Sequence, residues 1–163
     1  FEKIFTIFLE MDGVEPIGLG ARDSLRLEAG LCLYGNDLDE TITPIEAGLL
    51  WTIPKHRRKM GGYPGEQIIT EQIVKGPSRR RVGIKPNGRA PARAGTKILN
   101  KNGDLIGMIT SGGFGPTIGG PIAMGYVNVE DATIGKTVDI LIRDKCNSAE
   151  ICPTVFVPHQ YYK

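Results

Sequence analysis

Apolar residues near the start of the chain recur at helical spacing. Within residues 1–11, Ile4 and Phe8 lie one turn apart, as do Phe5 and Leu9, while charged residues fill another face. This pattern predicts a short amphipathic helix.

A second short helix is expected over residues 21–29. Ala21, Leu25 and Ala29 share one stripe at helical spacing. Gly30 follows as a suitable stop, because glycine readily adopts the left-handed conformation found after helix ends. Further helical segments are expected at residues 43–50 and 66–74.

Beyond residue 78 the pattern changes to short strands. Asn102–Gly103 supplies the positive φ angles of a tight turn, so the apolar runs on either side are expected to form a hairpin. The expected strands are 81–84, 97–100, 105–110, 123–129, 138–142 and 151–157. With no long helix between them, they predict a small antiparallel barrel.

Gly76, Pro77 and Ser78 form the best linker in the sequence, because glycine and proline disfavour both regular structures. We therefore divide the chain into residues 1–76, the end of an α/β region, and residues 77–163, the barrel. The predicted fold class is α+β.

Charge and composition exclude several classes of protein. The net charge is only +2, and the basic clusters at residues 55–59 and 79–81 are not interleaved with aromatic residues, so no nucleic-acid partner is expected. Such clusters are typical of solvated faces, although they also suit an acidic partner or an anionic substrate. No apolar stretch approaches the roughly 20 residues that span a bilayer, so no membrane segment is expected.

The cysteine pattern argues against metal and disulfide scaffolds. Three cysteines occur without metal-ligand spacing, so neither a metal site nor a disulfide framework is expected, and the thiols are expected to be reduced. Residues 110–120 hold five glycines but match no phosphate-binding pattern. We expect this segment to be a loop that allows close backbone approach to a neighbouring domain or a ligand.

Two arginines of the second predicted helix are candidates for anion binding. Arg22 and Arg26 lie one turn apart and project on one side, so both guanidinium groups are able to meet carboxylates. The alternative for Arg22 is an ion pair with Asp23 or Glu28 that only holds the helix in place.

Residues 18–40 carry the strongest signal in the chain. The elements Arg-Asp, Arg-Leu-Glu-Ala and Leu-Tyr-Gly-x-Asp occur there in the order that resembles the signature of the glycine cleavage T-protein (aminomethyltransferase) family. Later stretches are also similar to that family, and their sequences most resemble those of mitochondrial members. These stretches are residues 43–51, 63–65, 92–99, 107–112, 123–127, 156–158 and 161–162.

The resemblance implies a three-domain fold around a central hole that holds tetrahydrofolate. The reaction it implies moves the methylene carbon of an aminomethyl group from the lipoylated H-protein to tetrahydrofolate and releases ammonia, in the mitochondrial matrix. The aspartate and glutamate that the family uses near the pterin belong to its N-terminal half, so no catalytic residue is assigned here. Because Phe1 opens the chain inside a helical pattern, we expect an upstream part to be missing and the segment alone to be inactive.

The resemblance carries over four folate-binding candidates. Arg26 matches an arginine near the p-aminobenzoyl-glutamate end of folate, whose carboxylates suit a bidentate guanidinium. Arg93 matches a barrel arginine near the same cavity, with an interdomain salt bridge as the alternative. Tyr161 or Tyr162 matches a tail tyrosine near the folate opening, with a packing role as the alternative.

Other conspicuous residues receive structural interpretations. Tyr34 and Trp51 are expected to fill core space. Asp37 and Asp39 belong to a different family motif from the catalytic aspartate, and neither is assigned its role.

Two other functions remain open from the sequence. One is a folate-binding region of a dimethylglycine or sarcosine dehydrogenase, or of a relative that maintains iron–sulfur proteins. The other is a non-catalytic interaction module. In an aminomethyltransferase, the candidates for docking the acidic lipoyl carrier protein are Arg57, Arg58, Arg79 and Arg80.

Overall fold

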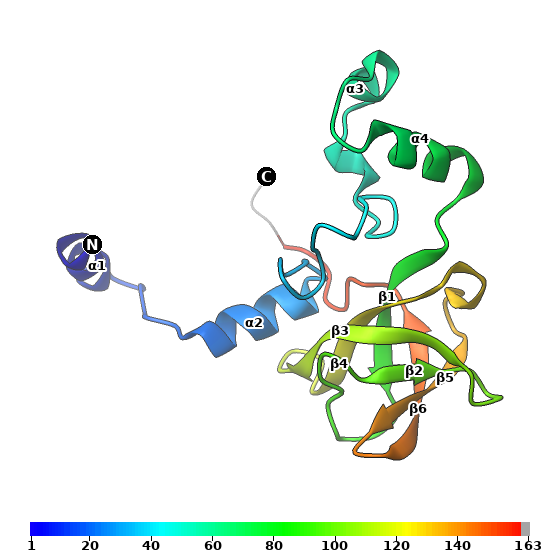
Figure 1. Ribbon diagram of the computed structural model, residues 1–163. Helices are drawn as coiled ribbons and strands as arrows, with labels where there is room; N and C mark the ends of the chain where they lie inside the picture. The colour runs from blue at the N-terminus through cyan, green and yellow to red at the C-terminus, as the bar shows by residue number, and fades with distance from the viewer. Residues whose placement is uncertain (161–163) are drawn as a thin grey trace.

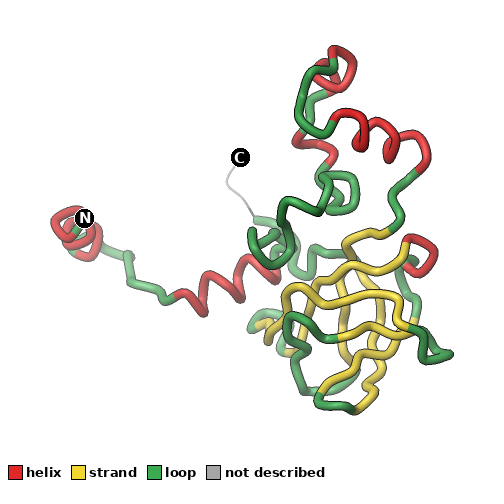
Figure 2. Tube along the Cα trace, viewed as in Figure 1, coloured by secondary structure: helices red, strands yellow, loops and turns green. Residues whose placement is uncertain are grey.

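Antiparallel strands close into a barrel in the second half of the chain (Figures 1 and 2). In this computed structural model, which describes residues 1–160, the strand order is β1-β4-β3-β2-β5-β6, and β1 also pairs with β6 to close the barrel. The strands are β1 (Arg79–Pro86), β2 (Lys97–Leu99), β3 (Leu105–Gly115), β4 (Gly120–Asn128), β5 (Thr137–Ile142) and β6 (Lys145–Cys152). Each of these strands pairs with two neighbours, which confirms the predicted barrel.

Aliphatic side chains fill the barrel. Val138 and Ile140 alternate along β5 and both point inward, as the two-residue period of a strand requires. In β4, by contrast, residues 121–127 are all buried. The outer face of this strand is covered because Leu27 packs with Ile122 and Met124 in a second cluster.

The helices lie outside the barrel. They are α1 (Glu2–Leu9), α2 (Leu19–Glu28), α3 (Lys55–Met60) and α4 (Glu66–Lys75), with short 3-10 turns at η1 (Leu50–Thr52) and η2 (Val129–Asp131). Helix α2 packs on β3 and β4. Helix α1 lies at the end of an extended arm, and α3 and α4 stand together away from the barrel (Figure 1). The predicted helices at 1–11, 21–29 and 66–74 are confirmed.

The buried side of α2 differs from the predicted stripe. Leu25 is exposed, whereas Leu27 and Glu28 are buried against the barrel. The prediction was wrong because the face that packs inward includes a charged residue, which a hydrophobic pattern assigns to solvent. Gly30 does end the helix, with φ +71°.

Three other expectations were wrong in detail. The predicted helix at 43–50 is a series of turns before η1, and α3 was not predicted. The glycine-rich segment is a hairpin, since β3 runs to Gly115 and β4 begins at Gly120. The last strand ends at Cys152, because residues 153–157 leave the barrel and return towards α2.

The hydrophobic clusters of the described residues both involve the barrel. Residues 19–50 are held largely by contacts with it, through α2 and the loop that follows. The division at residues 76 and 77 stays a prediction.

Candidate functional site

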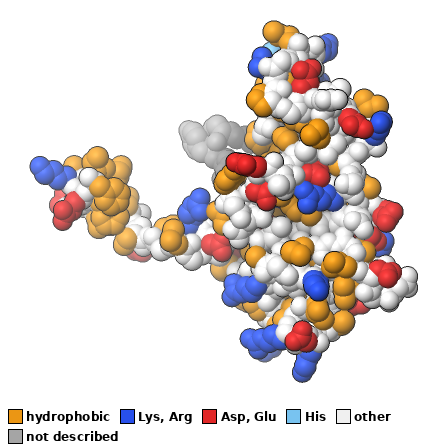
Figure 3. Space-filling model, viewed as in Figure 1, with side chains coloured by type: hydrophobic (Ala, Val, Ile, Leu, Met, Phe, Trp, Pro, Cys, Tyr) orange, Lys and Arg blue, Asp and Glu red, His pale blue; other side chains and the backbone are white. Residues whose placement is uncertain are grey.

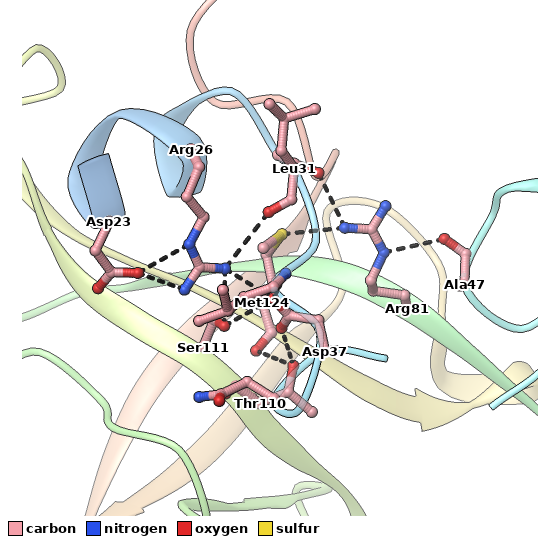
Figure 4. A network of polar contacts seen from close by, with 12 residues as sticks. Asp23, Arg26, Leu31, Asp37, Ala47, Arg81, Thr110, Ser111 and Met124 are labelled. Atoms are coloured by element: carbon pink, nitrogen blue, oxygen red, sulfur yellow. Dashed lines mark hydrogen bonds and ion pairs between the residues drawn. The ribbon is translucent and has the colours of Figure 1, made fainter. Parts of the chain in front are cut away.

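The site begins with the pairing of Arg26 and Asp37. The Arg26 Nη1 atom lies 2.7 Å from Asp37 Oδ2, and its Nε and Nη2 atoms donate to Asp23 Oδ1 at 2.9 and 2.6 Å. The Asp37 side chain is fully buried and that of Arg26 is only 10% exposed. Figure 4 shows the two charges at the centre of a polar network between α2 and β3.

A β-bulge brings two consecutive residues of β3 to the same carboxylate. Thr110 Oγ1 donates to Asp37 Oδ1 at 2.5 Å, and Ser111 Oγ donates to Asp37 Oδ2 at 2.8 Å. Neighbouring residues of a regular strand point to opposite faces. Here the register shifts between Ile109 and Ser111, and the bulge re-aims both hydroxyls towards one partner.

Asp37 also fixes the loop in which it lies. Its carboxylate accepts from the Leu33 backbone N–H at 2.9 Å, and its carbonyl accepts from the Tyr126 hydroxyl at 2.9 Å. Burial raises the pKa of Tyr126, so the hydroxyl stays a donor. A buried carboxylate that meets this many donors is fully compensated for its loss of water.

A cleft of about 480 Å³ opens beside this network. Its walls come from α2, the loop after it and the barrel: Leu19, Arg22, Asp23, Arg26, Leu33, Asn36, Arg93, Ala94, Ser111 and Gly112. Arg22 of α2 and Arg93 of the segment before β2 are both exposed on this lining, and Arg93 Nη1 donates to the Gly112 carbonyl at 3.4 Å. Two exposed guanidinium groups on one cleft make it suitable for an anion with planar acceptors.

Glu28 anchors the end of the β3–β4 hairpin to α2. Its carboxylate accepts from the backbone N–H groups of Thr117 and Ile118 at 2.7 and 3.2 Å, and from the Thr117 hydroxyl at 2.9 Å. The Glu28 carbonyl accepts from the backbone of Phe156 and Val157. One residue therefore joins the helix, the hairpin and the C-terminal segment.

Arg81 forms a second internal tie beside the first (Figure 4). Its Nε donates to the Ala47 carbonyl at 3.0 Å and its Nη1 to the Gly30 carbonyl at 2.9 Å. These contacts fix the loop after α2 and the turn at Ala47 to β1. The walls of the cleft are thus held by side chains of the barrel.

Comparisons with known proteins agree with this architecture. Residues 79–158 match the model of the "Glycine cleavage T-protein C-terminal barrel domain", and residues 4–57 match that of the "GCVT N-terminal domain". The chain belongs to the glycine cleavage T-protein family.

Relatives of this T-protein family are similar over nearly the whole chain. The mitochondrial aminomethyltransferase of Mesembryanthemum crystallinum is 53% identical over 92% of this chain and 36% of its own, and that of Gallus gallus is 50% identical over 91% and 38%. The crystal structure of aminomethyltransferase T from Bartonella henselae has a TM-score of 0.94 and 45% identity, over 99% of this chain and 45% of that one. The chain thus spans little more than a third of these curated relatives.

The structure brings together two of the candidates that the T-protein resemblance supplied. Arg26 and Arg93 both line the cleft. They differ in how readily they could bind a ligand. The Arg26 guanidinium is hydrogen-bonded to Asp23, Asp37 and Ser111, whereas Arg93 is exposed. Tyr161 and Tyr162 lie outside the described residues.

Other residues are placed differently from expectation. Tyr34 and Trp51 are 72% and 77% exposed, so the prediction that they fill core space was wrong. Asp23 pairs with Arg26 and Glu28 binds the hairpin, so neither forms the ion pair considered for Arg22.

The basic candidates for carrier docking fall into two groups. Arg79 is committed internally, since its Nε lies 3.0 Å from Glu46 Oε1 and its guanidinium covers the Tyr126 ring. Arg58 is half-buried. Arg57 and Arg80 are exposed.

Asp37, Thr110, Ser111 and Tyr126 were missed as parts of the site. Two signals pointed to Asp37: it ends the Leu-Tyr-Gly-x-Asp element, and a basic residue on a packed helix face needs a buried acid. Among residues 1–160, no group of three or more metal-ligating side chains is present, and the cysteines are free thiols. No helix in the same range has the length and apolar character needed to cross a membrane.

Proposed function

We propose that the chain is the C-terminal part of a tetrahydrofolate-dependent aminomethyltransferase of the glycine cleavage system. The proposed reaction moves the methylene carbon from the aminomethyl-lipoyl group of the H-protein to tetrahydrofolate, with release of ammonia. Membership of the T-protein family supports this proposal, as do the aminomethyltransferase names of the relatives. These names favour it over a dehydrogenase-type relative or a non-catalytic module.

The observation that carries the folate proposal is the cleft between α2 and the barrel. Arg22 and Arg93 place exposed guanidinium groups on its walls. The glutamate tail of tetrahydrofolate carries carboxylates, which pair well with guanidinium groups at a partly desolvated surface. In this proposal the tail binds in the cleft.

Arg26 takes a different part in the proposal from Arg93. Its Nη1 atom donates to both Asp37 and Ser111, so its position is set by the protein. We infer that Arg26 shapes the cleft wall, while Arg22 and Arg93 make the direct contacts. No residue of this chain is assigned a role in the chemical step.

Activity of the full-length protein tests this function. Ammonia release from aminomethyl-loaded H-protein should depend on tetrahydrofolate, and Arg93→Ala should raise the KM for tetrahydrofolate about tenfold or more. Arg89→Ala, an exposed arginine outside the cleft, should not. Ammonia release that does not depend on tetrahydrofolate would refute the proposal.

The proposed carrier surface includes Arg57 and Arg80. Their exposed charges suit an acidic face of the H-protein, whereas Arg79 already pairs with Glu46. Arg57→Glu and Arg80→Glu should weaken H-protein binding and leave tetrahydrofolate affinity intact. Unchanged H-protein binding would remove this surface from the proposal.

The proposed compartment is the mitochondrial matrix. The plant and chicken relatives are named as mitochondrial proteins. Import of the full-length protein into isolated mitochondria, followed by fractionation, tests this location; recovery outside the matrix would contradict it.

A further inference from the structure

Arg93 reaches the cleft from a segment that is anchored to the barrel immediately before it. Ala92 is fully buried and belongs to the core cluster of the barrel. Arg93 is exposed on the cleft lining, and Figure 3 shows basic side chains on the face where α2 meets the barrel. The guanidinium that we propose as a ligand contact therefore starts one residue away from a fixed point of the fold.

Gly112 of β3 allows the segment before β2 to lie directly on the strand. A Cβ at position 112 would collide with the Ala92 carbonyl oxygen, whereas a Cβ at Gly113 would make only an ordinary contact, 3.6 Å from Leu27 Cδ2. Neither glycine has a positive φ angle, so the backbone at both positions accepts alanine. A side chain at position 112, but not at 113, would push the backbone beside Arg93 away from β3.

Thr96 fixes the backbone of Arg93 on its C-terminal side. The Arg93 N–H donates to the Thr96 hydroxyl at 3.2 Å, and the Thr96 N–H donates to the Arg93 carbonyl at 3.1 Å. Gly95, with φ +84°, lies at the position of this turn that needs a positive φ in type II geometry. Ile109 of β3 accepts from the Gly95 N–H and donates to the Thr96 carbonyl, both at 2.9 Å. The turn that carries Arg93 is therefore bound to the strand that forms the cleft wall.

We propose that Gly112 and Thr96 are positioning residues for the binding of tetrahydrofolate through Arg93. Gly112 sets how closely the backbone beside Arg93 approaches β3, and the Thr96 hydroxyl sets the direction in which Arg93 leaves the turn. A side chain whose starting point is fixed loses less conformational freedom when it pairs with a carboxylate. This inference rests on the proposed function of the cleft, and neither positioning residue touches the folate.

Steady-state kinetics of the full-length protein tests this inference. Thr96→Val removes the hydroxyl at nearly constant volume and should raise the KM for tetrahydrofolate about threefold to tenfold at unchanged kcat. Thr96→Ser keeps the hydroxyl and should restore the parent KM. Gly112→Ala should raise KM about tenfold, as Arg93→Ala does, whereas Gly113→Ala, at the neighbouring position, should leave KM unchanged.

A double-mutant cycle separates positioning from general destabilisation. Because Gly112 acts through Arg93, Gly112→Ala should change KM less than about twofold in the Arg93→Ala background. An effect of full size in that background would overturn the inference, as would a raised KM in Gly113→Ala. The comparison of Thr96→Val with Thr96→Ser decides by itself if Gly112→Ala does not fold.

Failure of this inference is distinguishable from failure of the proposed function. A raised KM in Arg93→Ala beside a parent KM in Thr96→Val, or a Thr96→Ser protein no better than Thr96→Val, would overturn only the positioning roles. A parent KM in Arg93→Ala would refute the folate contact of Arg93 itself, and this inference with it.

Discussion

Arg26 and Asp37 form a buried ion pair, with 2.7 Å between Nη1 and Oδ2, that ties α2 to the loop leading away from it. Ser111 bridges the same two charges from the barrel, since its hydroxyl accepts from Arg26 and donates to Asp37. The wall of the proposed folate cleft therefore depends on contacts between distant parts of the chain, since Arg26 and Ser111 are 85 positions apart in the sequence.

Removing Asp37 should strongly destabilise the protein. Asp37→Ala removes the buried partner of Arg26 Nη1 and the shared acceptor of Thr110 and Ser111, which should lower the free energy of unfolding by roughly 3–5 kcal/mol. Asp39→Ala is the matched control, because Asp39 lies in the same loop and is exposed, and its carboxylate accepts from the backbone and hydroxyl of the neighbouring Thr41. Urea unfolding measures both variants, and equal midpoints would contradict a central role for Asp37.

Arg81 should not tolerate lysine. Arg81→Lys loses the geometry that reaches the Ala47 and Gly30 carbonyls together and should cost roughly 1–3 kcal/mol. Arg80→Lys, at the exposed neighbouring position, should change stability little. Thermal unfolding compares the two, and a stable Arg81→Lys protein would show that the carbonyl contacts are dispensable.

Two glycines with the same backbone conformation should respond differently to alanine. Gly30 and Gly48 have φ of +71° and +72°, but only at Gly30 would a Cβ collide, with the Thr154 carbonyl oxygen. Gly48→Ala should therefore cost about 1 kcal/mol, and Gly30→Ala roughly 2 kcal/mol or more. Similar losses in denaturant unfolding would mean that the C-terminal segment does not pack against Gly30.

The cysteines should differ in reactivity with pH. Burial raises the pKa of the Cys152 thiol to about 11, and Glu150 adds to the rise. At pH 8 only about one Cys152 thiol in a thousand is the reactive thiolate. Iodoacetamide should therefore modify exposed Cys146 first, and the rate at Cys152 should keep rising towards pH 11. Mass spectrometry resolves the sites, and equally fast labelling at pH 8 would contradict the raised pKa of the half-buried Cys152 thiol.

Local patterns predicted the elements that local contacts determine. The hairpin between β2 and β3 follows from Asn102–Gly103, where Gly103 has φ +89°, and α4 follows from its own spacing. The same reasoning failed at α2. Glu28 is buried there because its carboxylate accepts from the backbone N–H groups of Thr117 and Ile118, which lie 89 and 90 positions away in the sequence. A hydrophobic pattern contains no information about such a partner.

The candidate site was predictable only in part for a related reason. The sequence showed two arginines one turn apart on a helix. Which of them is free to bind an anion depends on which guanidinium pairs with other residues of the fold. Arg26 is the one that pairs internally, because Asp37 lies beside it and the bulge directs Thr110 and Ser111 towards Asp37. A bulge arises from strand pairing, so the sequence around Arg26 does not specify it.

Calorimetric titration of tetrahydrofolate onto the full-length protein tests the central claim most directly. The parent should bind, and Arg22→Ala and Arg93→Ala should each weaken binding by roughly 1.5–3 kcal/mol, about one to two decades in Kd. Arg89→Ala should bind as the parent does. A parent that does not bind tetrahydrofolate, or variants of both cleft arginines with unchanged Kd, would contradict the assignment of the cleft as the folate site.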